Sequence, residues 1–374
     1  MTGVVHIVVL VAGLLVLLGT TSSVVRTLVV PRALRSRIAH GVQRAVARSF
    51  HLVADRIGDL ERRDGLLAWV GPVTVLGLLI IWLLGYLAGY SLLEYATGHP
   101  HAALAVREAG SSLFTLGFAS SESGPLTAVD FAAAATGPLV VGLQVGYLPT
   151  LYAAYNRREV EVTSLEARAG SPAWGPEILA RHTTVGTLDN LGNLYERWER
   201  WAADVAESHT NYPVLVRFRS PDPRRDWLIA LLAVADSAAL HLALCPSRRQ
   251  GEARICVRAA FTCLRDLARS EGIPFDPDPD PDSEIQLDIG EFAAAVDFLV
   301  DLGYPAERSI EDAWPHFRGW RVNYESIVYQ LAERLDSPPA LWSGSRHGKP
   351  APMPPLRPVN RQPGGRTDRP RPGQ

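Results

Sequence analysis

Charged side chains are missing from three long stretches of this 374-residue chain. Residues 4–25, 66–90 and 131–155 contain no Asp, Glu, Lys or Arg. Each stretch is long enough to cross a hydrocarbon core of roughly 30 Å as a helix. The even spread of apolar residues that is typical of a soluble protein is therefore excluded, and three membrane-spanning helices are predicted.

Cysteine is scarce, and the motifs of common enzymes and cofactor sites are missing. The chain has 3 cysteines, Cys245, Cys256 and Cys263. This odd number falls in the part expected to be cytosolic, which predicts free thiols that fill apolar space. The sequence lacks a glycine-rich dinucleotide fingerprint, a paired-cysteine zinc spacing and a nucleophile motif. We therefore predict no enzyme activity, no cofactor and no nucleotide-sensing Rossmann domain.

Arginine is concentrated on one side of the predicted spans. Residues 31–65 carry eight arginines, and Arg157 and Arg158 follow the third span, whereas residues 91–126 contain only Arg107. The positive-inside rule predicts a multi-pass protein of the plasma (inner) membrane with its N-terminus outside and its C-terminus cytoplasmic. A cleaved signal peptide is the competing interpretation of residues 1–25, but it needs positive charge before the apolar run.

The predicted domains follow from these patterns. Residues 1–30 form an N-terminal transmembrane helix, and residues 31–65 form a basic cytosolic segment whose apolar residues recur every three to four positions over 33–60. Such a helix either lies on the cytosolic lipid surface or packs on the cytosolic domain with its arginines in water. Residues 66–156 are the pore domain, residues 157–338 a cytosolic domain, and residues 339–374 a disordered Pro/Arg-rich tail.

The cytosolic part is predicted to be all-α. Its periodicity predicts helices over residues 187–209, 226–244, 252–270, 289–302 and 309–335. A strand is weakly indicated only at residues 214–218. The alternating Asp-Pro run at 275–284 lacks the turn glycine and bidentate Glu of a calcium loop, so it is interpreted as an acidic linker. The arginines of the tail lack interleaved aromatic residues, and no nucleic-acid partner is predicted.

Four histidines and a set of three aromatic residues are interpreted as core or surface residues and not as ligands. His182, His209, His241 and His316 lack metal-ligand spacing. Tyr195, Trp198 and Trp201 recur at three-residue steps, which is typical of a buried helix face.

Residues 110–120, Gly-Ser-Ser-Leu-Phe-Thr-Leu-Gly-Phe-Ala-Ser, lie between the second and third apolar stretches. This segment resembles the end of the pore helix and the selectivity filter of the potassium channel family, in its prokaryotic two-transmembrane pore-loop form with an extra N-terminal helix. The resemblance covers residues 66–156. It implies a re-entrant pore helix at 101–114 and a filter formed by Thr115, Leu116, Gly117, Phe118 and Ala119.

The resemblance also implies a ligand and an assembly. Backbone carbonyls of Thr115, Leu116, Gly117 and Phe118 would replace the hydration shell of a monovalent cation, K⁺ or Na⁺, at the axis of a homotetramer. The Thr115 hydroxyl would face the inner cavity, and the Phe118 ring would pack behind the filter. The sequence departs from the family at Ala119, where the family has glycine, so we expect backbone strain there and weaker potassium selectivity. Glu122 is either an outer ring of charge or a solvated loop residue.

The third span contains several helix-breaking residues. In pore channels the inner helix bends at a glycine or proline, and Gly142, Gly146 and Pro149 are the candidate gating hinge. Gly142 and Gly146 also fit a small-xxx-small packing pattern. Gln144 is expected to face the cavity or a neighbouring helix.

The sequence therefore predicts a pore-loop cation channel of the lipid membrane with a helical cytosolic domain. The alternative is a non-conducting membrane scaffold or signalling protein with channel-like topology. A membrane-bound enzyme is the third and least favoured interpretation, because the sequence shows no cluster of nucleophile, base or metal ligands.

Overall fold

The computed structural model describes residues 2–30, 36–98, 101–119, 124–248, 251–345 and 351–356. Within these ranges the structure contains helices and no strand, which confirms the all-α prediction. The chain divides into two compact units: unit 1 comprises Met1–Tyr155 and Val214–Phe218, and unit 2 comprises Asn156–Pro213 and Arg219–Gln374.

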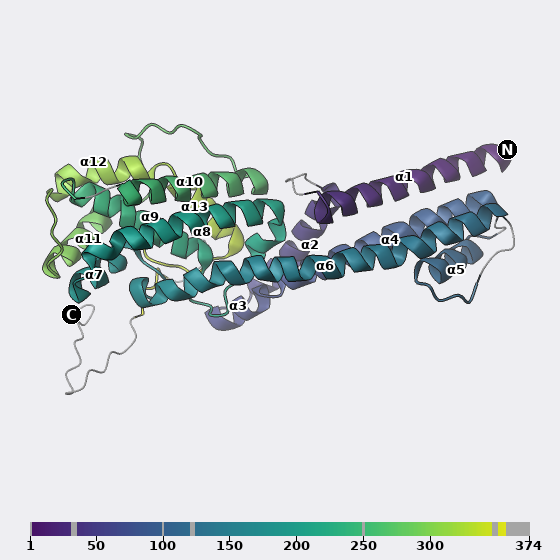
Figure 1. The fold of residues 1–374 in the computed structure, drawn as a ribbon, viewed down its shortest axis with the longest axis horizontal. Helices are drawn as coiled ribbons and strands as arrows, with labels where there is room; N and C mark the ends of the chain where they lie inside the picture. Colours follow the sequence, from purple (N-terminus) through teal and green to yellow (C-terminus); the bar gives the residue numbers. More distant parts are fainter. Residues whose placement is uncertain are drawn as a thin grey trace, which may run out of the picture. The chain divides into compact units, whose positions relative to one another are not determined.

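Unit 1 is a group of long apolar helices joined by shorter ones (Figure 1). Its helices are α1 (Thr2–Leu28), α2 (Arg37–Ala54), α3 (Leu60–Leu67), α4 (Val70–Thr97), α5 (Ala102–Leu113) and the first part of α6 (Gly124–Ala169). Helix α6 has 46 residues and continues into unit 2.

Within the described ranges, four helical segments are long and apolar enough to cross a membrane: Gly3–Leu28, Leu60–Thr97, Gly124–Ala169 and Trp227–Leu244. The three predicted spans lie within the first three segments. These segments expose much of their apolar surface, since only 11%, 39% and 22% of their most apolar windows are buried. The fourth segment is 100% buried inside unit 2. A helix that is apolar on all sides belongs either in a membrane or in a protein core, and complete burial is typical of a core.

Helices α1 and α4 pack as an antiparallel pair. The ring of His6 stacks on that of Tyr95, and the indole Nε1 of Trp82 donates to Ser23 Oγ at 3.0 Å. Glycine permits the close approach, because a Cβ at Gly89 would lie 2.6 Å from Leu17 Cδ2. The N-terminal helix therefore packs as part of unit 1.

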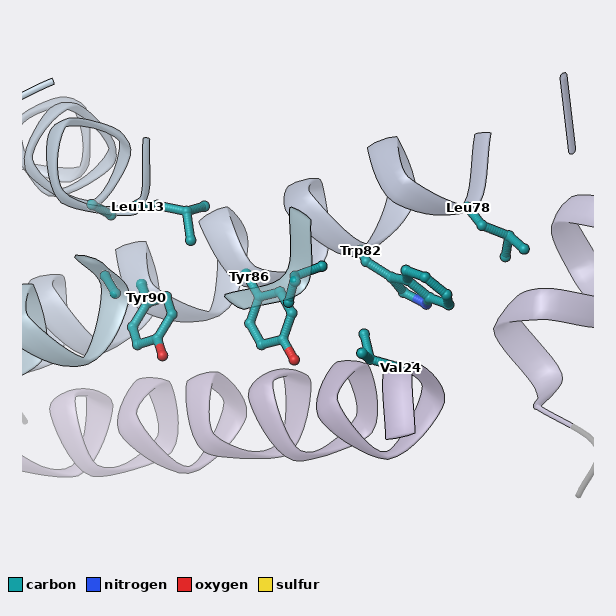
Figure 2. Packing of buried hydrophobic residues seen from close by; sticks show 9 residues of the cluster. Val24, Leu78, Trp82, Tyr86, Tyr90 and Leu113 are labelled. Atoms are coloured by element: carbon teal, nitrogen blue, oxygen red, sulfur yellow. The ribbon is translucent and has the colours of Figure 1, made fainter. Parts of the chain in front are cut away.

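A row of aromatic side chains forms the centre of unit 1. Figure 2 shows Trp82, Tyr86 and Tyr90 spaced along α4, with Val24 of α1 close to the indole. Tyr90 donates from its hydroxyl to the Ala132 carbonyl of α6 at 3.2 Å, so the row contacts α6 as well as α1.

The basic segment forms two helices, and its apolar face contacts α4. Ser36 caps the start of α2 by accepting a hydrogen bond from the Ala39 amide. Ile38, Ala39 and Val42 then pack against the α1–α4 cluster. The apolar face of α2 thus covers α4 of its own unit, while the position of α2 relative to lipid stays a prediction. The predicted single helix over 33–60 is wrong at residues 55–59, and residues 31–35 lie outside the described residues.

Unit 2 surrounds the buried helix α9 (Trp227–Leu244). Its other helices are α7 (Gly175–Val185), α8 (Leu191–Asn211), α10 (Gly251–Glu271), α11 (Ile289–Asp301), α12 (Ile310–Arg321) and α13 (Glu325–Leu335), together with the short 3₁₀ helix η1 (Leu188–Asn190). The sequence missed α7 and predicted α12 and α13 as one helix. The break falls at residues 322–324, where Tyr324 turns inward and is fully buried.

Two further predictions are wrong in the described residues. Residues 214–218 form the 3₁₀ helix η2 (Pro213–Arg217) and its end, not a strand. The predicted disordered tail begins too early, because Ala340, Trp342 and Ser343 are buried. The Trp342 ring packs against Trp174 and Phe317. The free energy gained by this burial offsets the conformational entropy that is lost when the segment is ordered. Residues 346–350 and 357–374 lie outside the described part of the chain.

Candidate functional site

The candidate site is α5 with the loop that follows it, residues 114–119, and the parts of α4 and α6 that hold them. Ala105, Glu108, Ala109 and Leu113 recur at helical spacing and are buried, whereas Arg107 between them is exposed. This face directs α5 against α4 and α6 of unit 1. The prediction placed the pore helix at 101–114, and α5 covers all but its two end residues.

The end of α5 is closed by a Schellman motif with threonine at the left-handed position. The Leu116 amide donates to the Ser111 carbonyl at 2.7 Å, and the Thr115 amide donates to the Ser112 carbonyl at 3.0 Å. Thr115 consequently has φ +56°, where glycine is usual and a β-branched residue is an outlier. A strained residue of this kind is a feature of functional segments.

Ser111 fastens the far end of the loop to α5. Its buried hydroxyl donates to the Ala119 carbonyl at 3.0 Å and accepts from the Ala119 amide, also at 3.0 Å. Gly117, between the two anchored ends, has φ +71°. The loop is thus a closed turn of defined shape in which Thr115 and Gly117 alone adopt left-handed φ values.

The terminal turn of α5 lies directly on Gly137 of α6. A Cβ at Gly137 would overlap the Leu113 carbonyl oxygen, so only glycine permits this approach. Ser112 Oγ donates to Asp130 Oδ1, and the Tyr90 hydroxyl shares a 2.7 Å hydrogen bond with Thr136 Oγ1. These contacts fix the end of α5 against both flanking helices.

The structure places the five predicted filter residues together in this loop, on the surface of the single chain. Phe114, Leu116 and Phe118 are 45%, 62% and 55% exposed. The expected strain at Ala119 is not found, because its φ is not left-handed; the strain falls on Thr115 instead. The Phe118 ring lies under the Arg107 guanidinium of α5, 5.4 Å from it. Glu122 lies outside the described residues.

The predicted hinge residues lie on the exposed side of α6, which is one continuous helix through all three of them. A Cβ at Gly142 or Gly146 would meet nothing within 4 Å, so neither glycine mediates packing within the chain. Hinge bending stays a prediction. Gln144 faces a neighbouring helix, since its Nε2 donates to the Val75 carbonyl of α4 at 3.3 Å.

Unit 2 offers a polar core with structural roles. Arg321 is fully buried and donates to Asp236, Glu325, the Tyr329 hydroxyl and the Trp342 carbonyl. Asp236 also accepts from the Tyr324 hydroxyl at 2.8 Å. Such complete pairing is typical of a structural network.

Three histidines and the three cysteines of unit 2 are buried in its core: His182, His209, His241, Cys245, Cys256 and Cys263. Among the described residues no group of three or more His, Cys, Asp or Glu could hold a metal ion. His209 Nε2 accepts a hydrogen bond from Arg158 Nη1 at 3.0 Å, and burial followed by the Arg158 charge lowers the pKa of His209 well below the ordinary range. The three cysteines are free and buried, as predicted.

Sequence reasoning missed the residues that hold the loop. Ser111 and Gly137 carry no pattern that separates them from other small residues of a membrane helix. Gly137 was given no role by the sequence, although its missing side chain is what α5 requires.

Comparison with known families, curated proteins and solved structures finds no match. What the fold defines is an all-helical protein with four apolar helices, compatible with a multi-pass membrane protein.

Proposed function

We propose that this chain is a pore-loop cation channel in which residues 115–119 form the narrow part of the path. The observation that carries the proposal is the backbone of the loop. Thr115 and Gly117 have φ +56° and +71°, and the residues next to them do not have left-handed φ. Alternation of this kind can turn successive carbonyls towards one side, whereas an extended strand points them to both sides in turn. A ring of such carbonyls replaces water around a cation.

The position of the loop supports the same proposal. It follows a helix of 12 residues, too short to span a membrane, between α4 and α6, which have the length to span. Irregular backbone at membrane depth is tolerated where it is buried in protein or lines water. We assign α1, α4 and α6 to the membrane and α9 to the core of a cytosolic unit, because α9 is wholly enclosed by unit 2.

A homotetramer follows from this assignment as part of the proposal. One chain contributes one loop, and the family's filter uses four. Phe114, Leu116 and Phe118 are exposed in the single chain, and neighbouring loops would cover them. Unit 2, on the arginine-rich side, would then assist assembly or gating.

Selectivity is expected to be weak at the outermost site. The Ala119 carbonyl accepts a hydrogen bond from the Ser111 hydroxyl, so it is less available to a cation than a free carbonyl. We therefore expect poorer discrimination of K⁺ from Na⁺ than in a channel with glycine at this position.

The test is current through planar bilayers that contain the purified protein, under asymmetric KCl and NaCl. Gly117→Ala should reduce the current strongly, because φ +71° resists a side chain. Gly186→Ala is the matched control, since Gly186 has φ +72° and equally open surroundings but lies in unit 2. Normal current in Gly117→Ala, or a monomer by native mass spectrometry in folded protein, would reject the channel and favour the scaffold.

A further inference from the structure

A proline-rich segment near the C-terminus docks on unit 2 through its backbone. Residues 351–356, Ala-Pro-Met-Pro-Pro-Leu, belong to the tail that the sequence predicted as disordered. The Met353 amide donates to the Pro339 carbonyl at 2.9 Å, and the Leu356 amide donates to the Ser171 carbonyl at 3.0 Å. Each contact belongs to an isolated β-bridge. The segment therefore joins two parts of unit 2 that are far apart in the sequence.

The composition of the segment leaves it few groups with which to bind. Proline has no N–H, so only Ala351, Met353 and Leu356 have an amide that can donate. Two of these three amides make the hydrogen bonds to unit 2. The prolines also restrict the backbone to extended conformations, so less entropy is lost on docking. Such a preformed shape is what makes proline-rich segments good ligands for protein surfaces.

The side chains of the segment alternate between unit 2 and solvent. Met353 and Pro355 are partly buried, whereas Pro354 between them is exposed. Gly170, which ends α6 with φ +72°, makes room for the inward side. A Cβ at Gly170 would lie 2.5 Å from Pro355 Cβ and 3.0 Å from the Leu356 carbonyl oxygen, so only glycine permits this approach.

The backbone at residues 339–342 is fixed by contacts that do not involve the segment. The Ser343 hydroxyl accepts from the Ala340 amide at 3.1 Å and donates to the Ala340 carbonyl at 2.7 Å. The Trp342 carbonyl accepts from the buried Arg321 guanidinium at 2.6 Å. A surface that is held in shape in this way binds a peptide without a further cost of ordering.

We propose that residues 170–171 and 339–340 form a docking face of unit 2 that recognises an extended proline-rich peptide, and that the chain's own residues 351–356 are its ligand. Recognition requires two backbone amides three residues apart, with prolines between them, as in Met-Pro-Pro-Leu. A tethered ligand has an effective concentration in the mM range, so it closes the docking face to other peptides until it is released. The docking face belongs to unit 2 and is independent of whether the loop of unit 1 conducts.

The first test is hydrogen exchange of the purified full-length protein in detergent. Exchange at Met353 and Leu356 should rise at least about tenfold in Gly170→Ala, because the added methyl group displaces the segment. Gly272→Ala is the matched control, since Gly272 also lies in unit 2 and has φ +68°, but a Cβ there meets nothing within 4 Å. It should keep the wild-type rates. Equal rates in all three proteins would overturn the proposal.

The second test supplies the ligand from outside and does not depend on the folding of Gly170→Ala. The full-length double variant Met353→Pro, Leu356→Pro removes both amide donors and keeps the segment extended. A synthetic peptide of residues 351–356 with blocked ends should bind this variant at least about tenfold more tightly than the wild type, because the tethered competitor is gone. Isothermal titration calorimetry measures the affinity.

Ala351→Pro is the control for the second test. It removes the third amide of the segment, which makes no hydrogen bond in the described part of the chain. The segment should stay docked in this variant, and the peptide should bind it as weakly as it binds the wild type. Absence of binding to the double variant, or equal affinity for all three proteins, rejects the docking face.

Discussion

Thr115 has a β-branched side chain but a left-handed backbone conformation, and the two do not fit together. Its backbone closes α5 in a left-handed conformation, which glycine adopts without strain and a β-branched residue resists. The conformation therefore costs about 1–2 kcal/mol. The Thr115 hydroxyl donates a hydrogen bond to the Phe114 carbonyl at 2.8 Å.

Thr115→Gly should raise the thermal stability of unit 1, by about 1 kcal/mol, because the strain is removed. Asp336→Gly provides the comparison, since Asp336 closes α13 with φ +58° but is not β-branched. Its gain should be smaller, because Asp tolerates this conformation better. Calorimetry of both variants in the same detergent measures the difference, and an equal or reversed order would count against strain at Thr115.

The sequence predicted the residues of the loop but not its geometry. Order, spacing and the Thr, Gly and aromatic residues located the segment at 115–119. Backbone strain was predicted at Ala119 because the potassium channel filter has glycine at that position. The loop depends on two hydrogen bonds between Ala119 and the hydroxyl of Ser111, eight residues earlier, and no local pattern encodes such a partner.

At the scale of helices, the contact between α5 and α6 depends on a missing side chain. Gly137→Ala should displace the end of α5, because the added methyl group would overlap the Leu113 carbonyl oxygen. We expect a loss of about 1–3 kcal/mol, as for other overpacked sites. Thermal unfolding and hydrogen exchange over residues 102–119 measure it.

Gly142→Ala is the control for this prediction. It makes the same change five residues later in the same helix, where a Cβ meets nothing within 4 Å. Alanine favours helix over glycine, so this variant should be neutral or slightly more stable. If both variants unfold alike, the close approach at Gly137 does not hold α5.

Helix positions were predicted better than helix neighbours. Apolar periodicity located α8, α9, α10 and α11 to within a few residues, because burial on one face leaves a repeating signal. The same signal does not say which surface covers that face. Helix α2 is the example: its Ile38 and Val42 fit lipid equally well by composition, and only the structure places them on α4.

At the scale of the whole molecule, unit 2 contains a buried histidine that acid should destabilise. Burial and the Arg158 charge lower the pKa of His209 in the folded chain below its ordinary value of about 6.5. Below that pH the unfolded chain binds a proton that the folded chain does not, so stability falls as pH falls. The slope from this one group is at most about 1.4 kcal/mol per pH unit.

His209→Gln should reduce this acid sensitivity while it keeps an acceptor for Arg158. Denaturant unfolding followed by tryptophan fluorescence between about pH 8 and pH 5 measures it, since Trp227 lies beside His209. The exposed His316→Gln is the control and should behave as the wild type does. Equal pH slopes in all three proteins would contradict the assignment.

The carboxyl group of Asp236 has a consequence for how the chain is made. During synthesis α9 emerges as an 18-residue segment that is mostly apolar and long enough to cross a bilayer. An aspartate near the centre of such a segment opposes insertion by roughly 2.5–3.5 kcal/mol. On the proposed topology, the residue that pairs with Arg321 in the folded unit would therefore also disfavour the transfer of α9 into the bilayer before α12 has been translated.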